Sequence, residues 1–271
     1  MKSHKTSQLS RLFGSFASYS FPTYIQTVIN KAYVYFMKVD MSAFDTPSSY
    51  PSLNALFTRA LKQDRRLEGD ENTCISPCDA FISEAGQIEA SSAFQIKGFS
   101  YKVNELLGSY ILKKEKDTLE GGAFINFYLS PRDYHRYHVP IDMKICKAVH
   151  IPGKLYPVNF TWLQKMPSLF VENERVVLEC ENRAGARFYL VFVGALNVGK
   201  MAFIFDENIQ TNVKASHETY YMYEDLWLQK GEELGRFEMG STIVALFAKG
   251  SLHLTKNVNE PVRFGEAIGS F

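Results

Sequence analysis

The dipeptide Gly240-Ser241 carries a hydroxyl group that can react with its own backbone. Gly240 has no side chain to shield its carbonyl, and the Ser241 hydroxyl lies one bond rotation away from that carbonyl. Attack of the hydroxyl would turn the peptide bond into an ester. Taken alone, however, a Gly-Ser pair before an apolar run is more often a turn that leads into a strand.

The segment 129–140 is the second stretch whose residue types suit chemistry. It follows a predicted strand and holds His135 and His138 between Pro131 and Pro140. Imidazole is the side chain best suited to moving protons near neutral pH. The spacing His-x-x-His supplies only two metal ligands, and no third ligand is marked by its position, so we expect no metal site.

Asp79 is the third candidate, in a proline-containing turn after Ser76-Pro77-Cys78. Its carboxylate could orient a histidine, although, taken alone, an Asx-type turn is the better explanation of an aspartate here. Asp79, His138 and Ser241 together could form the triad of a serine hydrolase. The nucleophile-elbow pattern G-x-S-x-G is absent around Ser241, and the carbonyl that Ser241 reaches most easily is that of Gly240.

Composition narrows the class of protein that must position these residues. The chain has 271 residues and a net charge of +1, so no strong electrostatic field attracts nucleic acid, and we expect no nucleic-acid partner. Aromatic residues make up 14%, which suits strands and also a protein that meets a membrane surface. No run of about 20 nearly uncharged residues is present, so we predict no transmembrane span.

The N-terminal part is predicted to be helical, with Pro22 in the first turn of a second helix. Apolar residues recur there every three or four positions, at Ile25, Val28, Ile29, Ala32, Tyr33 and Phe36. This face fits either a helix that lies in a membrane interface or one that docks on the protein's own core. A further short helix is predicted after Ser52, and we interpret the charged segment 62–70 as a solvated connection.

From Cys74 onward, short apolar runs alternate with turn residues and predict strands. We therefore expect an α+β protein, with a helical N-terminal membrane-associating region at 1–66 and a β-rich catalytic domain at 67–271. The strands are predicted at 123–129, 146–151, 176–180, 188–193, 200–205, 243–247 and 252–254, and helices between them at 101–107 and 160–166.

The chain resembles the phosphatidylserine decarboxylases of the bacterial membrane-associated type. The most specific motifs are Ser130-Pro131-Arg132-Asp133-Tyr134-His135-Arg136-Tyr137-His138 and Lys230 to Thr242, and the resemblance is strong from about residue 50 to the end. Three departures from the family pattern are Met239 for leucine, Ala80 for glycine and Arg65-Arg66-Leu67 where Arg-Pro is common. None of them removes a reacting group.

The resemblance implies a self-processing enzyme. His138, oriented by Asp79, would deprotonate Ser241, and cleavage at Gly240-Ser241 would give a β chain (1–240) and an α chain (241–271). A pyruvoyl group derived from Ser241 would then be the covalent cofactor. It would form a Schiff base with phosphatidylserine and act as an electron sink while carbon dioxide leaves, giving phosphatidylethanolamine. His135 is the expected proton donor to the resulting carbanion, with His138 as the second choice.

The resemblance also implies partners and a location. The implied partners are phosphatidylserine, the membrane surface and the two chains of the protein's own precursor. A homodimer is compatible with the resemblance. The expected location is peripheral, on the cytoplasmic face of the bacterial cell membrane. Two alternatives stay open at this point: a serine hydrolase that uses Asp79, His138 and Ser241 without cleaving itself, and an inactive membrane-peripheral binding protein.

Overall fold

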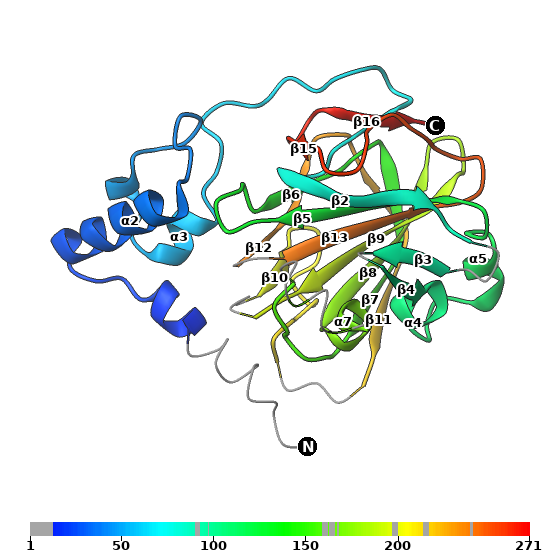
Figure 1. The fold of residues 1–271 in the computed structure, drawn as a ribbon, viewed down its shortest axis with the longest axis horizontal. Coiled ribbons are helices and arrows are strands. Elements are labelled where there is room, and N and C mark those ends of the chain that lie inside the picture. Colours follow the sequence, from blue (N-terminus) through cyan, green and yellow to red (C-terminus); the bar gives the residue numbers. More distant parts are fainter. Residues whose placement is uncertain are drawn as a thin grey trace.

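The computed structural model describes residues 13–89, 93–96, 98–158, 162, 166, 168–196, 200–213, 217–238 and 241–271. A small group of helices at the N-terminal end lies beside a larger body of strands (Figure 1). The chain passes from one to the other through an extended segment at 58–72. This arrangement confirms the predicted α+β class.

Short helices account for little of the chain outside the N-terminal part. Residues 13–18 are helical, and the further helical elements are α2 (Thr23–Met37), η1 (Pro47–Ser49), α3 (Leu53–Phe57), α4 (Val103–Leu107), α5 (Lys113–Asp117) and α7 (Leu169–Glu172). The helix predicted at 101–107 begins later than expected, because β4 (Phe99–Lys102) occupies its first residues. The helix predicted at 160–166 lies almost entirely outside the described residues.

The centre of the protein is an eight-stranded antiparallel sheet with the order β11-β7-β8-β9-β13-β5-β2-β15. Its strands are β2 (Ala80–Gln87), β5 (Ala123–Leu129), β7 (Met143–Ile151), β8 (Arg175–Asn182), β9 (Arg187–Gly194), β11 (Thr219–Leu228), β13 (Ser241–Phe247) and β15 (Pro261–Val262). The strand predicted at 123–129 is confirmed as β5, and those predicted at 146–151, 176–180, 188–193 and 243–247 are parts of β7, β8, β9 and β13.

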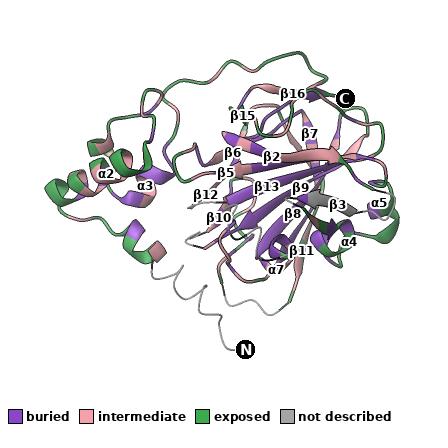
Figure 2. Ribbon diagram, in the orientation of Figure 1, coloured by how far each residue is buried: buried purple, intermediate pink, exposed green. Residues whose placement is uncertain are grey.

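Strand β13 lies in the middle of this sheet, and all of its residues are buried (Figure 2). Ile243, Ala245 and Phe247 join one hydrophobic cluster, whereas Val244 and Leu246 join another. Successive side chains of a strand point to opposite faces, so the sheet is covered on both faces. This double burial explains why β13 reads as an unbroken apolar run and not as an alternating one.

Smaller sheets complete the β-rich body. One has the order β10-β12-β6, with β10 (Met201–Phe203), β12 (Glu233–Phe237) and β6 (Arg136–His138). The others join β1 (Thr73–Ile75), β16 (Ala267–Ser270) and β14 (His253–Leu254), and β3 (Ala93–Ile96) and β4. The chain leaves β12 and enters β13 four residues later, so the segment before Ser241 connects the small sheet to the large one.

Helix α2 covers only part of the apolar face that its sequence predicts: Ile29 and Tyr33 pack partly buried on the small N-terminal core. Its buried residues are polar: the Gln26 side chain donates to Asn30 (2.8 Å), and the Asn30 amide donates to the carbonyls of Pro47 (2.8 Å) and Tyr50 (3.0 Å). Val28 and Phe36, two members of the predicted face, are 66% and 74% exposed. These hydrogen bonds tie α2 to the η1 turn and leave much of its apolar surface in contact with solvent.

Candidate active site

Ser241 is fully buried at the start of β13, where its backbone pairs with Leu129 of β5 and Gly194 of β9. Within the described part of the chain its Oγ has no hydrogen-bond partner. The next hydroxyl, that of Thr242, is directed at Asn126 Oδ1 (2.9 Å) and the Phe127 carbonyl (2.7 Å). Buried hydroxyls normally have a hydrogen-bond partner, so a Ser241 hydroxyl without a described partner is a candidate for a reacting group.

His135 is also fully buried, and its tautomer follows from one contact. Its Nδ1 lies 2.8 Å from the carbonyl oxygen of Asp133 and therefore donates to it, which leaves Nε2 with a lone pair. No described residue binds this Nε2. Burial lowers the pKa of His135 to about 3, so the ring is neutral at physiological pH.

Two contacts fix His135 in place. The Phe237 amide, four positions before Ser241, donates to the His135 carbonyl (2.9 Å). The ring centroid of Phe57, from helix α3 of the N-terminal part, lies 3.9 Å from that of the imidazole. The helical region therefore packs directly on this histidine, and His135 lies on the segment paired with the approach to the Gly240-Ser241 bond.

His138 is held by partners at both ring nitrogens. Its Nδ1 donates to the Gly231 carbonyl (2.9 Å), and its Nε2 accepts from the Tyr134 hydroxyl (3.0 Å). The ring stacks on Phe264 at a centroid distance of 3.6 Å and an interplanar angle of 13°. Burial lowers the pKa of His138, and its hydrogen bond to Gly231 opposes this effect. His138 is thus a neutral base whose lone pair is occupied by a hydroxyl.

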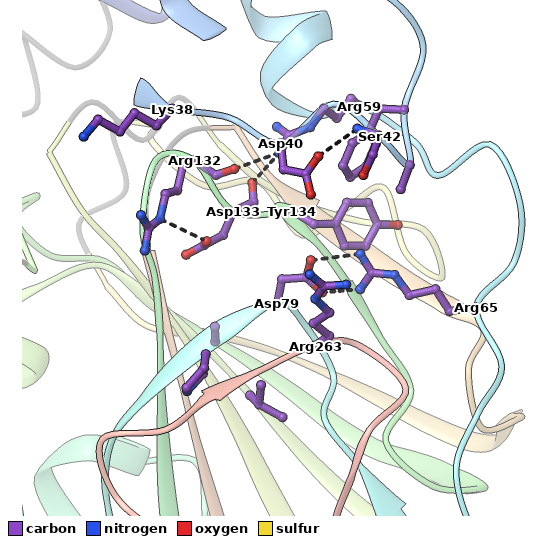
Figure 3. Close-up of a pocket in the computed structure, with 15 residues that line it drawn as sticks. Lys38, Asp40, Ser42, Arg59, Arg65, Asp79, Arg132, Asp133, Tyr134 and Arg263 are labelled. Atoms are coloured by element: carbon purple, nitrogen blue, oxygen red, sulfur yellow. Dashed lines mark hydrogen bonds and ion pairs between the residues drawn. The ribbon is translucent and has the colours of Figure 1, made fainter. Parts of the chain in front are cut away.

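Asp79 does not contact His138 as the sequence led us to expect. Its carboxylate forms a two-pronged ion pair with Arg65, in which Nη2 and Oδ2 are 3.0 Å apart, and Oδ1 also accepts from the Phe264 amide (2.8 Å) (Figure 3). The link to the histidine is therefore indirect: Asp79 holds the backbone of Phe264, and the Phe264 ring lies on His138.

Sequence reasoning missed several residues of this site. Arg65 belongs to the charged segment that we interpreted as solvated, yet its guanidinium is largely covered and pairs with Asp79. Arg59, two residues after the end of helix α3, is only 2% exposed. Phe57 and Phe264 were missed because an isolated phenylalanine carries no signal of a catalytic neighbour.

Two cavities lie where the helices meet the β-rich body. The first, of about 310 Å³, is lined by Lys38, Asp40, Ser42, Ala43, Phe44, Arg59, Arg65, Asp79, Ala80, Arg132, Asp133, Tyr134, Pro261, Val262 and Arg263 (Figure 3). The second, of about 590 Å³, is lined by Ser18, Asp45, Tyr50, Ser52, Asn54, Ala55, Thr58, Arg59, Ala60, Leu61, Arg136, Arg236 and Glu238. Arg59 belongs to both, and the second cavity reaches the chain three residues before Ser241.

The arrangement suits intramolecular attack better than attack on an external ester. The Ser241 hydroxyl is buried in the uncleaved chain, and the preceding carbonyl belongs to the adjacent residue, so attack on it needs no access route from solvent. His135 lies at the end of β12 that leads to β13, whereas His138 pairs with Glu233 at the start of β12. Both imidazoles are neutral and have Nε2 lone pairs that can accept a proton. Within the described residues, no group of three or more histidine, cysteine, aspartate or glutamate side chains could hold a metal ion.

Comparisons with known proteins agree with this geometry. Residues 53–270 match the sequence model of the family described as phosphatidylserine decarboxylase. The chain is 50% identical over 265 residues to a phosphatidylserine decarboxylase proenzyme of Helicobacter pylori, an alignment that covers 97% of this chain and 96% of that protein. Proteins with the same name from Campylobacter jejuni (50%; 96% and 97% covered) and Stutzerimonas stutzeri (36%; 96% and 89% covered) are also similar.

Proposed function

The chain belongs to the phosphatidylserine decarboxylase family, and on this basis we propose that it is a proenzyme that cleaves itself at Gly240-Ser241 and then decarboxylates phosphatidylserine to phosphatidylethanolamine. The observation that carries the proposal is the buried, unpartnered Ser241 hydroxyl at the start of a central strand. The products of cleavage are a β chain of residues 1–240 and an α chain of residues 241–271.

For self-cleavage, we assign the proton acceptor to His138 and the nucleophile to Ser241. The Gly231 carbonyl holds the Nδ1 proton of His138 and so keeps the Nε2 lone pair available. The Tyr134 hydroxyl occupies that lone pair in the uncleaved chain, so it must turn away before His138 can accept the Ser241 proton. Asp79 supports this step as a positioning residue, through Phe264.

The residue that would carry the cofactor is Ser241, converted to an N-terminal pyruvoyl group on the α chain. Its environment fits such a group, because the Ser241 side chain has no partner to lose and its backbone is held by two neighbouring strands. The group supplies an electron sink for the electrons left behind when carbon dioxide departs.

For decarboxylation, we assign the proton transfers to His135. Its Nε2 is free to take a proton from the ammonium group of the substrate, and the imidazolium formed can return a proton to the α-carbon after carbon dioxide has left. Burial keeps His135 in the base form beforehand, because it lowers the pKa of the ring. One residue then serves as base first and as acid second.

The N-terminal helices would bring the site to the bilayer. The described residues include no helix that is long and apolar enough to cross a membrane. Several large side chains of the N-terminal part are nevertheless exposed, namely Tyr19 (60%), Tyr24 (73%), Val28 (66%), Tyr35 (78%) and Phe36 (74%). A surface of this kind suits the interface of a membrane. Because Phe57 of the same region packs on His135, docking would place the catalytic histidine close to the lipid head groups.

The test of the proposed function is the intact mass of the purified protein before and after borohydride treatment. We expect two chains divided at Gly240-Ser241, with an α chain whose blocked N-terminus gains two hydrogen atoms on reduction. Ser241→Ala should remain one chain and be inactive, whereas Ser251→Ala, which removes a hydroxyl bonded only within its own turn, should cleave normally. A single uncut chain with esterase activity would instead support the serine hydrolase alternative.

Two finer points remain predictions of the same proposal. We expect a homodimer, which is tested by measuring the molecular mass of the processed protein in solution. The cytoplasmic face of the membrane is checked by protease accessibility in inverted and right-side-out vesicles.

A further inference from the structure

Arg59 is a buried cation without a described counter-ion. It is 2% exposed, and no carboxylate of the described residues lies within 4.0 Å of its guanidinium. Only Nη2 is satisfied, by the carbonyls of Arg132 (2.9 Å) and Asp133 (3.1 Å). Nε and Nη1 have no partner in the part of the chain that the structure describes. Buried arginines are normally paired, so this one lacks an anion.

The free nitrogens belong to a residue that lines both cavities. The guanidinium carbon lies 4.4 Å from the centroid of Phe44, which supports one face of the group. Burial lowers the pKa of Arg59, and the carboxylates of Asp79 and Asp133 only partly offset this effect. Asp79 is already paired with Arg65, and the Asp133 carboxylate faces Arg132 (3.9 Å) and accepts from the Ser130 amide (2.7 Å). The surroundings therefore leave positive charge in excess.

Arg59 and His135 donate hydrogen bonds to the same backbone carbonyl oxygen. The Asp133 carbonyl oxygen accepts from His135 Nδ1 at 2.8 Å and from Arg59 Nη2 at 3.1 Å. The two nitrogens are therefore separated by at most the sum of these distances. In phosphatidylserine the phosphate and the amino group are joined through one oxygen and two carbon atoms, which is a separation of the same order. The guanidinium of Arg59 and the imidazole of His135 are therefore neighbours, and one lipid head group is long enough to reach both residues.

We propose that Arg59 binds the phosphodiester of the phosphatidylserine head group through an N–H group that has no partner among the described residues. This inference rests on the proposed function and adds the residue that recognises the substrate. Cδ separates Nε–H from Nη1–H, and Nη2 is already bound to two carbonyls, so the guanidinium offers a phosphate oxygen a single charge-assisted hydrogen bond together with its unpaired positive charge. The carboxylate of the substrate is the less favourable occupant, because an arginine would stabilise the negative charge that decarboxylation must remove. The phosphodiester keeps its charge throughout the reaction.

The test measures binding to processed enzyme that has been inactivated by borohydride, so that the readout is affinity and not turnover. The probes are dihexanoyl-phosphatidylserine and dihexanoyl-phosphatidylethanolamine, titrated by calorimetry into the parent, Arg59→Gln and Arg59→Lys. The loss of a charge-assisted pair predicts about 10- to 100-fold weaker binding of both lipids to Arg59→Gln. Arg59→Lys keeps the charge but not the planar guanidinium and its fixed N–H directions, and should bind with an intermediate affinity.

The control is Arg183→Gln, because the Arg183 side chain is 60% exposed and lines neither of the two cavities. We expect less than about threefold weaker binding for this variant, in keeping with an exposed charge. Unchanged affinity of both Arg59 variants for both lipids would overturn the inference. So would a loss confined to phosphatidylserine, which would assign Arg59 to the carboxylate. If Arg59→Gln does not fold, Arg59→Lys alone decides, since parent-like affinity there contradicts recognition by the guanidinium group. If the parent itself neither cleaves nor binds either lipid, the proposed function has failed instead.

Discussion

The neutral state of buried His135 predicts how the stability of the uncleaved protein changes with pH. The pKa of this imidazole is lowered to about 3 in the folded chain, whereas an imidazole in an unfolded chain titrates near 6.5. As pH falls below 6.5, the unfolded chain therefore takes up a proton that the folded chain does not. The contribution of His135 to stability is complete above pH 6.5 and is lost progressively as pH falls from there toward 3.

The size of this effect at pH 5 follows from the two pKa values. Relative to pH 7.5, unfolding becomes easier by about 2 kcal/mol from His135 alone. The figure changes little for any folded-state pKa below about 4, because the folded ring is then almost entirely neutral at pH 5. The expected loss of stability therefore rests on the burial of His135 and on the contact of its Nδ1 with Asp133, whatever the folded-state pKa is below about 4.

The assay compares urea unfolding of two proteins that cannot cleave themselves, Ser241→Ala and Ser241→Ala/His135→Asn. Asparagine keeps a donor for the Asp133 carbonyl but does not titrate. Between pH 7.5 and 5, the first protein should lose about 2 kcal/mol more stability than the second. The exposed His253→Asn on the same background controls for removing an imidazole. A difference below about 0.5 kcal/mol would show that His135 is hydrated or charged in the folded protein, and the reasoning would fail.

Three further predictions concern catalysis, positioning and the membrane. His135→Ala should still cleave itself but decarboxylate at least about 100-fold more slowly, whereas His138→Ala should remain uncut. Gel electrophoresis measures cleavage, and carbon dioxide release measures decarboxylation. If His135→Ala loses cleavage and decarboxylation equally, the two histidines do not have separate roles. Asp79→Asn should lower stability by about 1–3 kcal/mol in urea unfolding, because an amide NH₂ would face Arg65; parent-like stability would contradict the ion pair. Replacing Tyr35 and Phe36 by serine should weaken co-sedimentation with anionic vesicles at least about tenfold. The control is serine at two exposed residues of the β-rich body, Ile204 and Met222, and equal weakening there would contradict a membrane surface on α2.

The strands and the reacting residues were predictable because their signals are local. An apolar run such as 243–247 predicts a strand wherever it lies, since a fully buried strand needs apolar side chains on both faces. Ser241 was identified from its own neighbour, Gly240, because the reaction proposed for it involves only the adjacent peptide bond. His135 and His138 were identified by chemical type and by their place after a strand.

The partners of these residues were not predictable, because they come from distant parts of the chain. Asp79 was expected on His138, but a carboxylate goes to the strongest donor within reach, and folding brings Arg65 there. The same holds for Phe57 on His135 and for Phe264 on His138. The apolar spacing of α2 did not show which side is covered, since Gln26 and Asn30 satisfy buried carbonyls that only the fold creates.

The sequence by itself therefore determined which bond can break and which side chains can move protons, because those properties belong to residue types and to neighbours in the chain. Only the tertiary structure decided which polar atoms are left without a partner. Burial and hydrogen bonding depend on all the elements that meet at a point, here β12, β13, the segment 130–138 and helix α3. The polar side-chain atoms of Ser241, His135 and Arg59 that have no partner among the described residues lie where those elements meet, and they define the candidate site.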